Sequence, residues 1–177
     1  MSVLLDPERI FATLNLQAVR YVVIGGMAGN LRGTPDVTND LDICYERSDR
    51  NLERLAAALH DLGARLRVAR DDTPVRFPID ARSLRLGDTF TFTTDAGDLD
   101  VLGTPSGTDG FSDLAAGSTT FEVADGLLVD VASVDDLMRM KQASGRTKDR
   151  LHLEHLAALR EEIEELRSRG EDPQQGT

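Results

Sequence analysis

Asp40 and Asp42, two aspartates separated by one residue, are the side chains of this chain best suited to chemistry. They lie in the alternating segment DLDICY, which predicts a half-buried strand over 40–45. Residues two apart on a strand point to the same face, so the two carboxylates are about 6.5–7 Å apart along the backbone. Such a pair can hold one or two divalent cations. The spacing alone is uninformative, because the chain has 21 aspartates and a second such pair, Asp98 and Asp100.

The order of features before the first pair is more informative. The segment VRYVVI over 19–24 predicts a short strand, and Gly25 and Gly26 follow it at a predicted turn into a helix. Glycines let the backbone approach a ligand, and amides at a helix start are donors for phosphate oxygens. Together with a carboxylate-held magnesium ion, these parts suit a nucleoside triphosphate.

Two stretches resemble known nucleotidyltransferases. Gly25-Gly26 through Asp40-Leu41-Asp42 resembles the signature of the polymerase-β-like nucleotidyltransferase superfamily. The stretch VASVDDLMRMKQASGRTKDRLHLEHL, residues 131–156, resembles the C-terminal helices of AbiEii-type nucleotidyltransferases, many of which are toxins of toxin–antitoxin pairs. The two stretches occur in the order that the resemblance requires.

The resemblance implies a set of site residues. Asp40, Asp42 and a third carboxylate would hold Mg²⁺ or Mn²⁺. Asp100 is our first choice for the third carboxylate, which would also accept the proton of the attacking hydroxyl. Asp98 is the fallback, because it shares a strand face with Asp100. A solvated strand carboxylate is the alternative interpretation of Asp100.

The resemblance also assigns binding residues in the basic segment 139–150. Lys141 and Lys148 are the two lysines of the chain, and both lie in this segment. With the glycine pair, the residues implied to contact the triphosphate or the acceptor are Lys141, Arg146, Lys148 and Asp149. A surface helix pair with ordinary ion pairs is the alternative.

The chain departs from the family pattern at two positions. Gly26 stands where many superfamily members have serine, so backbone amides must replace a side-chain hydroxyl. Asp36 stands where AbiEii-like chains often have arginine. The aspartate would add negative charge near a triphosphate. Thr38, two residues before Asp40, is a candidate for regulatory phosphorylation, which would add a charge of about −1.5 to −2.

The surrounding pattern predicts an α/β nucleotidyltransferase fold with a mixed β-sheet flanked by helices and a C-terminal helical extension. We expect an α/β domain over 1–131, the helical extension over 132–168 and a disordered tail over 169–177. Helices are expected over 6–17, 27–31 and 49–62, from Ser133 and from Lys148, and strands over 19–24, 40–45, 89–94, 98–102, 119–123 and 127–131.

Composition limits the setting of the protein. The 177 residues carry a net charge of −11, with 20 basic and 31 acidic side chains. No apolar run is long enough for a membrane span, and the single Cys44 cannot form an internal disulfide, so we expect a cytoplasmic protein without a membrane partner. Residues 87–136 contain no lysine or arginine, whereas the segment 139–150 is basic, so we expect a polyanion to bind at this segment together with Arg65, Arg67, Arg70 and Arg76.

Other sites are less well supported. A Rossmann-type dinucleotide site would need Gly-x-Gly-x-x-Gly, which is missing, and Pro35 leaves no room for the long crossover helix. The chain has no Gly-Lys dipeptide and hence no P-loop. His152 and His155 are expected to be ordinary histidines on a helix surface.

The resulting prediction is an enzyme that transfers a nucleoside monophosphate from an NTP to a hydroxyl and releases pyrophosphate. The resemblance implies the 3′ end of tRNA as acceptor, a toxin that blocks translation, and a cognate antitoxin as partner. A protein or aminoglycoside hydroxyl, or a non-catalytic nucleotide-binding module, remains as an alternative.

Overall fold

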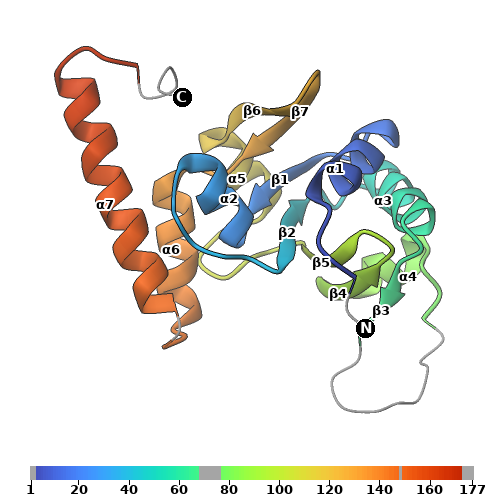
Figure 1. Ribbon diagram of the computed structural model, residues 1–177. Helices are drawn as coiled ribbons and strands as arrows, with labels where there is room; N and C mark the ends of the chain where they lie inside the picture. The colour runs from blue at the N-terminus through green and yellow to red at the C-terminus, as the bar shows by residue number, and fades with distance from the viewer. Residues whose placement is uncertain (1–2, 68–76, 148, 173–177) are drawn as a thin grey trace.

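The computed structural model describes residues 3–67, 77–147 and 149–172. Within these ranges, one mixed sheet has seven strands in the order β3-β4-β5-β2-β1-β7-β6 (Figure 1). The strands are β1 Tyr21–Ile24, β2 Asp40–Tyr45, β3 Arg65–Leu66, β4 Thr89–Thr94, β5 Gly97–Leu102, β6 Thr119–Ala124 and β7 Leu127–Val131. Central β1 is antiparallel to β2 and parallel to β7, whereas β2 and β5 are parallel. The predicted mixed sheet is therefore confirmed.

Helices flank this sheet and follow from local capping signals. They are α1 Pro7–Leu16, α2 Gly25–Arg32, α3 Asp49–Asp61, α4 Ala81–Leu86, α5 Phe111–Gly117, α6 Val134–Ser144 and α7 Asp149–Ser168. Asp6, Ser48, Asp80 and Ser133 each accept a hydrogen bond from the backbone N–H three residues later, which satisfies a free amide of the first turn. None of the helices in the described ranges is long and apolar enough to cross a membrane.

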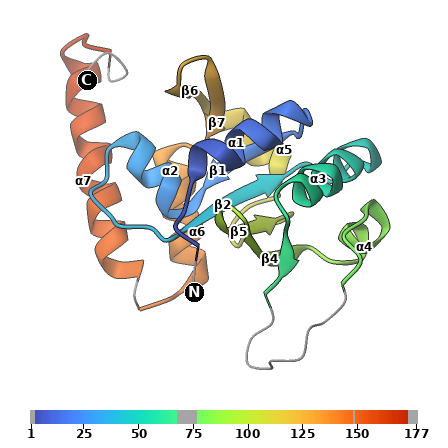
Figure 2. The same ribbon diagram turned by 45° about the vertical axis from the view of Figure 1, so that its right-hand side comes forward.

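The main core lies between the sheet and the helices α1 and α3, which pack against each other (Figure 2). Its fully buried side chains include Phe11 and Leu14 from α1, Leu55 from α3, and Leu41 and Ile43 from β2. Burial of each such side chain is worth about 1.5–3 kcal/mol. Because Leu41 and Ile43 face this core, the residues that alternate with them on β2 face the other way.

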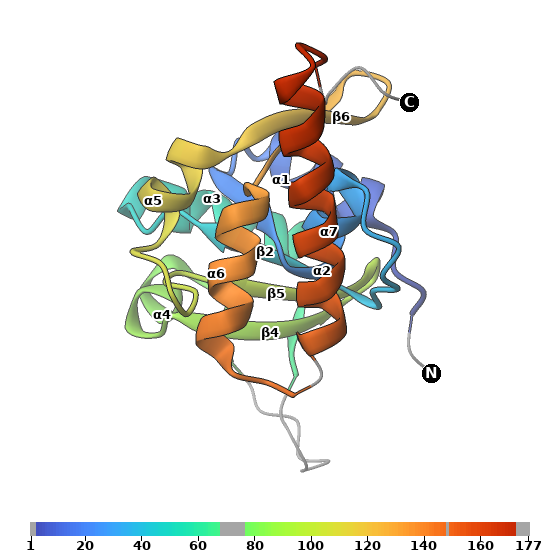
Figure 3. The same ribbon diagram turned by 90° about the vertical axis from the view of Figure 1, so that its left-hand side faces the viewer.

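The helices α6 and α7 lie side by side at the other end of the molecule (Figure 3). Helix α6 also packs against α2, and Leu137, Met138 and Leu156 are buried in the same apolar cluster as the sheet. The C-terminal helices are thus attached to the sheet domain through α2. The proposed division at residues 131 and 168 stays a prediction.

Several boundaries differ from the expected ones. The elements β3, α4 and α5 were not expected, because each is short and buries at most one fully apolar side chain, Leu84 in α4 and Leu114 in α5. Helix α2 begins at Gly25 instead of Met27. Lys148 and the tail residues 173–177 lie outside the described residues.

Candidate active site

Four carboxylates form an array on the sheet face opposite the core of α1 and α3. Asp40 and Asp42 point away from the buried Leu41 on β2. On the parallel neighbour β5, Asp98 is in register with Asp40, and Asp100 with Asp42. The structure therefore brings together the two Asp-x-Asp pairs that the sequence separates by more than 50 residues. We call these four residues the acidic array.

Burial and neighbouring negative charges both act on Asp42. Burial raises the pKa of Asp42 to about 7, and the negative charges of Asp40 and Asp100 act in the same direction. Lys141 and Arg146 lower the pKa of Asp42, so both cations lie close enough to act on it. A group of neighbouring carboxylates whose negative charges raise one another's pKa in this way favours a bound cation.

Arg67 forms an ion pair with each of the two carboxylates of β5. Its Nη1 lies 2.5 Å from Asp98 Oδ2, and its Nη2 lies 3.0 Å from Asp100 Oδ1. Asp98 also accepts a hydrogen bond from Thr93. Burial raises the pKa of Asp100, although Arg67 opposes the shift, and the charge of Asp40 adds to it. Asp100 is the β5 carboxylate that acts on Asp42, as expected for a third member of the site.

Gly25 brings the backbone into contact with the array. Its φ is +68°, in the left-handed region, and a Cβ at this position would lie 2.2 Å from Asp42 Oδ2. Helix α2 starts here without a side-chain cap, so the amides of its first turn are not covered by a capping side chain. These amides and the carboxylate of Asp42 are therefore neighbours, as a site for phosphate and metal requires.

Thr38 limits the space beside Gly26. A Cβ on Gly26 would lie 3.0 Å from both Cβ and Oγ1 of Thr38. The Thr38 hydroxyl donates hydrogen bonds to the backbone oxygen of Asp40 at 2.9 Å and to its Oδ1 at 3.2 Å. A serine at position 26 would therefore require the Thr38 side chain to shift by a few tenths of an ångström.

Two of the basic residues expected to bind the triphosphate or the acceptor, Lys141 and Arg146, lie among the described residues. Lys141 Nζ lies 3.4 Å from Asp149 Oδ1, and Asp149 also accepts a hydrogen bond from Ser144. Burial alone would raise the pKa of Asp149, but Ser144 and Lys141 together hold it below its ordinary value. Arg146 is exposed in the turn between α6 and α7. Lys148, the fourth expected binding residue, lies outside the described residues.

Asp36 and the two histidines of α7 form a cluster that the sequence did not predict. His155 Nδ1 lies 2.7 Å from Asp36 Oδ1, and His152 Nε2 lies 3.6 Å from the same oxygen. The Asp36 side chain is 8% exposed and each histidine about one third. The two histidines are thus partly exposed residues of α7 that also contact Asp36 in the loop before β2, and this contact was not expected. Asp36 and His155 are 119 residues apart, so no local pattern could have indicated their contact.

The donor chemistry of the array fits magnesium or manganese, which prefer carboxylate oxygens. The three side chains Asp40, Asp42 and Asp100 would hold the ion. Among the described residues, however, no group of three or more His, Cys, Asp or Glu side chains already surrounds a common point. Arg67 donates a hydrogen bond to Oδ1 of Asp100, so Arg67 competes with a metal ion for the charge of this carboxylate.

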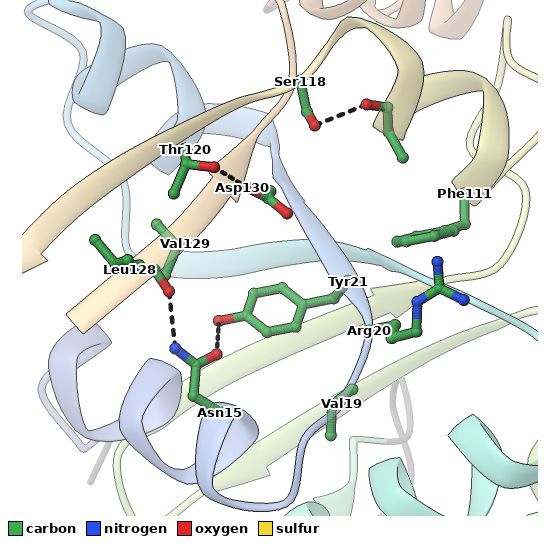
Figure 4. Close-up of a pocket in the computed structure, with 11 residues that line it drawn as sticks. Asn15, Val19, Arg20, Tyr21, Phe111, Ser118, Thr120, Leu128, Val129 and Asp130 are labelled. Carbon is green, nitrogen blue, oxygen red and sulfur yellow. Dashed lines mark hydrogen bonds between the residues drawn. The ribbon is translucent and has the colours of Figure 1, made fainter. Parts of the chain in front are cut away.

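A separate cavity of about 430 Å³ lies at the other end of β1 (Figure 4). Its polar lining groups are paired with one another. Tyr21 donates to Asn15, Asn15 donates to the Leu128 carbonyl, and Thr120 donates to Asp130. The register of β1 with β2 puts Tyr21 opposite Tyr45 and Ile24 opposite Asp42, so this cavity does not adjoin the acidic array.

Comparisons with known proteins agree with the fold described above. No family model matches the sequence, and no curated protein is significantly similar to it. Among solved structures, the lincosamide antibiotic adenylyltransferase LnuA with bound lincomycin superposes with a TM-score of 0.57 at 14% identity, over 90% of this chain and 99% of that chain. A Thermotoga maritima protein assigned as a nucleotidyltransferase superposes with a TM-score of 0.53 at 16% identity, over 92% of this chain and 97% of that chain.

A third similar structure is the antibiotic-resistance factor ANT(2″)-Ia in complex with adenylyl-2″-tobramycin. It superposes with a TM-score of 0.53 at 19% identity, over 92% of each chain. At these identities the comparisons concern the fold, and the fold accounts for nearly the whole chain in all three cases. The chain therefore has the fold of the nucleotidyltransferases.

Proposed function

We propose that this protein is a metal-dependent nucleotidyltransferase, which moves a nucleoside monophosphate from an NTP to a hydroxyl and releases pyrophosphate. The observation that carries the proposal is the contact between the acidic array and the start of α2. Asp42 and Asp100 lie on neighbouring strands, and the backbone of Gly25 approaches Asp42 too closely to tolerate a Cβ. Carboxylates for a cation and amides for phosphates thus meet at one point.

Each residue has a defined role in this proposal. Asp40 and Asp42 hold Mg²⁺ or Mn²⁺, and Asp100 completes the ligand set and takes the proton of the attacking hydroxyl. The bound ion supplies neutralisation of charge on the phosphates. The amides of Gly25 and Gly26 orient the phosphate oxygens.

The remaining contacts to the triphosphate or the acceptor are assigned to the basic segment. They come from Lys141, Arg146, Lys148 and Asp149. Lys141 and Arg146 already act electrostatically on Asp42, which is consistent with cations beside the phosphate site. A compact ammonium binds phosphate as a point charge, so Lys141 does not need a fixed planar geometry.

For the acceptor, we propose the 3′ end of tRNA, and for the biological role a toxin that is paired with a cognate antitoxin and blocks translation. Support comes from the resemblance of residues 131–156 to AbiEii-type enzymes and from the cations beside the array. With a net charge of −11, the protein would have to contact RNA at a few positions only. Its binding should therefore depend on salt with a shallow slope.

A cationic small molecule with hydroxyl groups, such as an aminoglycoside, is the second candidate acceptor. The overall acidic charge and the absence of lysine and arginine from residues 87–136 would attract such a molecule. The similar structures of LnuA with lincomycin and ANT(2″)-Ia with adenylyl-2″-tobramycin are antibiotic-modifying proteins. A protein hydroxyl is a third acceptor that the same chemistry could use.

A labelling experiment tests the proposal and separates the acceptors. The full-length protein is incubated with each α-labelled NTP, Mg²⁺ and, in parallel, total tRNA, total protein or a panel of aminoglycosides. Asp42→Asn serves as the inactive control, and Asp98→Asn is compared with Asp100→Asn to identify the third carboxylate. Labelled tRNA supports the toxin, and a labelled antibiotic or protein supports the corresponding alternative. No label on any acceptor would contradict the enzymatic proposal and favour a nucleotide-binding module.

A further inference from the structure

A chain of polar contacts connects Asp36 with Lys141. From the loop before β2, Asp36 Oδ1 lies 3.6 Å from Nε2 of His152 on α7. The other ring nitrogen of His152, Nδ1, lies 3.2 Å from Nζ of Lys141 on α6. We call Asp36, His152 and Lys141 the Lys141 support. It reaches from a side chain that is nearly buried to an ammonium that acts on Asp42.

The hydrogen bond between Lys141 and His152 fixes which ring nitrogen of His152 carries the proton. An ammonium has donors only, so His152 Nδ1 must accept from Lys141. A neutral imidazole with an acceptor at Nδ1 carries its proton at Nε2, which is the nitrogen that faces the carboxylate of Asp36. Asp36 thus favours the tautomer of His152 that Lys141 requires.

The same geometry disfavours a metal ion at this cluster. Asp36, His152 and His155 together resemble a ligand set, but the ammonium of Lys141 already lies against Nδ1 of His152. A second cation beside it would be repelled. In the described part of the chain, no such trio is arranged around a common point either. A role in placing Lys141 fits the contacts better than a role as ligand.

We propose that His152 and Asp36 are positioning residues that hold the Lys141 ammonium toward the triphosphate beside the acidic array. The inference rests on the proposed function, in which Lys141 binds the triphosphate. Asp149 and His152 contact Lys141 from two directions, so the flexible lysine stem is restrained before the nucleotide arrives. Restraint of this kind strengthens binding by reducing the entropy that is lost on association.

The test measures the dissociation constant of each NTP in the presence of Mg²⁺ for the full-length chain, by isothermal titration calorimetry. His152→Ala and Lys141→Ala should each weaken binding about tenfold, as expected when one charge-assisted contact to phosphate is misplaced or lost. The double variant should be no weaker than Lys141→Ala, because both changes remove the same contact. Asp36→Ala should weaken binding in the same direction, by about five- to tenfold, because it removes the carboxylate that orients His152.

Two further variants separate positioning from a general structural effect. His152→Asn retains an acceptor near the position of Nδ1 and should restore binding to within about threefold of the original chain. His155→Ala removes the closer contact to Asp36 on the same helix but leaves Lys141 and His152 in place, so it should also bind within about threefold. Circular dichroism verifies that each variant is folded.

The outcomes distinguish the inference from the proposed function. If His152→Ala binds NTP as well as the original chain, if the double variant is additive, or if His152→Asn is as weak as His152→Ala, the positioning role is overturned. If the original chain binds NTP and shows the expected pattern but labels no acceptor, the positioning role is supported and the transferase proposal fails. If the original chain binds no NTP, both are overturned.

Discussion

Asp42 should destabilise the metal-free protein, so Asp42→Asn should raise the free energy of unfolding. The pKa of Asp42 is raised from 3.8 to about 7, mainly by burial. Between these values the folded chain retains a proton that the unfolded chain has lost, so stability falls as the pH rises through this window. One pKa unit corresponds to about 1.36 kcal/mol. The gain from Asp42→Asn should therefore be on the order of 2 kcal/mol at pH 5 and about 4 kcal/mol at pH 8.

Urea unfolding in EDTA, followed by circular dichroism at both pH values, measures this gain. Asp98→Asn is the matched control, because it removes a carboxylate of the same array that is paired with Arg67 and should leave stability unchanged or lower it. Added Mn²⁺ should stabilise the original chain and have little effect on Asp42→Asn. A variant that is less stable than the original chain at pH 8, or a gain that is the same at both pH values, would refute the reasoning.

Three further changes test the surroundings of Asp42. Gly25→Ala forces a Cβ into a left-handed position 2.2 Å from Asp42 Oδ2, so it should cost at least about 1–2 kcal/mol in urea unfolding and abolish NTP labelling of the acceptor. Thr38→Glu, as a mimic of phosphorylation, should abolish labelling, whereas Thr38→Val should retain part of it; normal activity of Thr38→Glu would exclude the regulatory role. Arg67→Met should free Asp100 and tighten Mn²⁺ binding in calorimetry, whereas the control Arg65→Met, which loses only a pair with Asp95, should not.

The sheet could be predicted from the sequence because its strands carry local signals. The alternation of DLDICY and the β-branched run VRYVVI indicate β2 and β1, and both formed within two residues of the expected bounds. The short elements β3, α4 and α5 were missed, because two to seven residues do not establish a period. Their positions depend on packing against neighbours that are distant in the sequence.

From the sequence, the two aspartates of each Asp-x-Asp pair were expected on one face of their strand, but the pairing of the two strands was not predicted. The spacing put Asp98 and Asp100 on one face, but which of them acts on Asp42 depends on the register between β2 and β5. The position of Arg67 could not be predicted either. Its double ion pair results from the way β3 joins the edge of β4, and β3 has no sequence signal of its own.

Asp36 is an acidic residue whose surroundings are formed by residues distant in the sequence. From the sequence, an acid at this position adds negative charge near a triphosphate. In the structure the Asp36 side chain is almost buried, and its Oδ1 lies 2.7 Å from His155 Nδ1 and 3.6 Å from His152 Nε2. The negative charge then acts through His152 on the placement of Lys141. An arginine at position 36 would have no carboxylate to orient His152, and its positive charge would repel Lys141. Asp36 and His152 are therefore best understood as a pair, and a change at one should be judged together with the other.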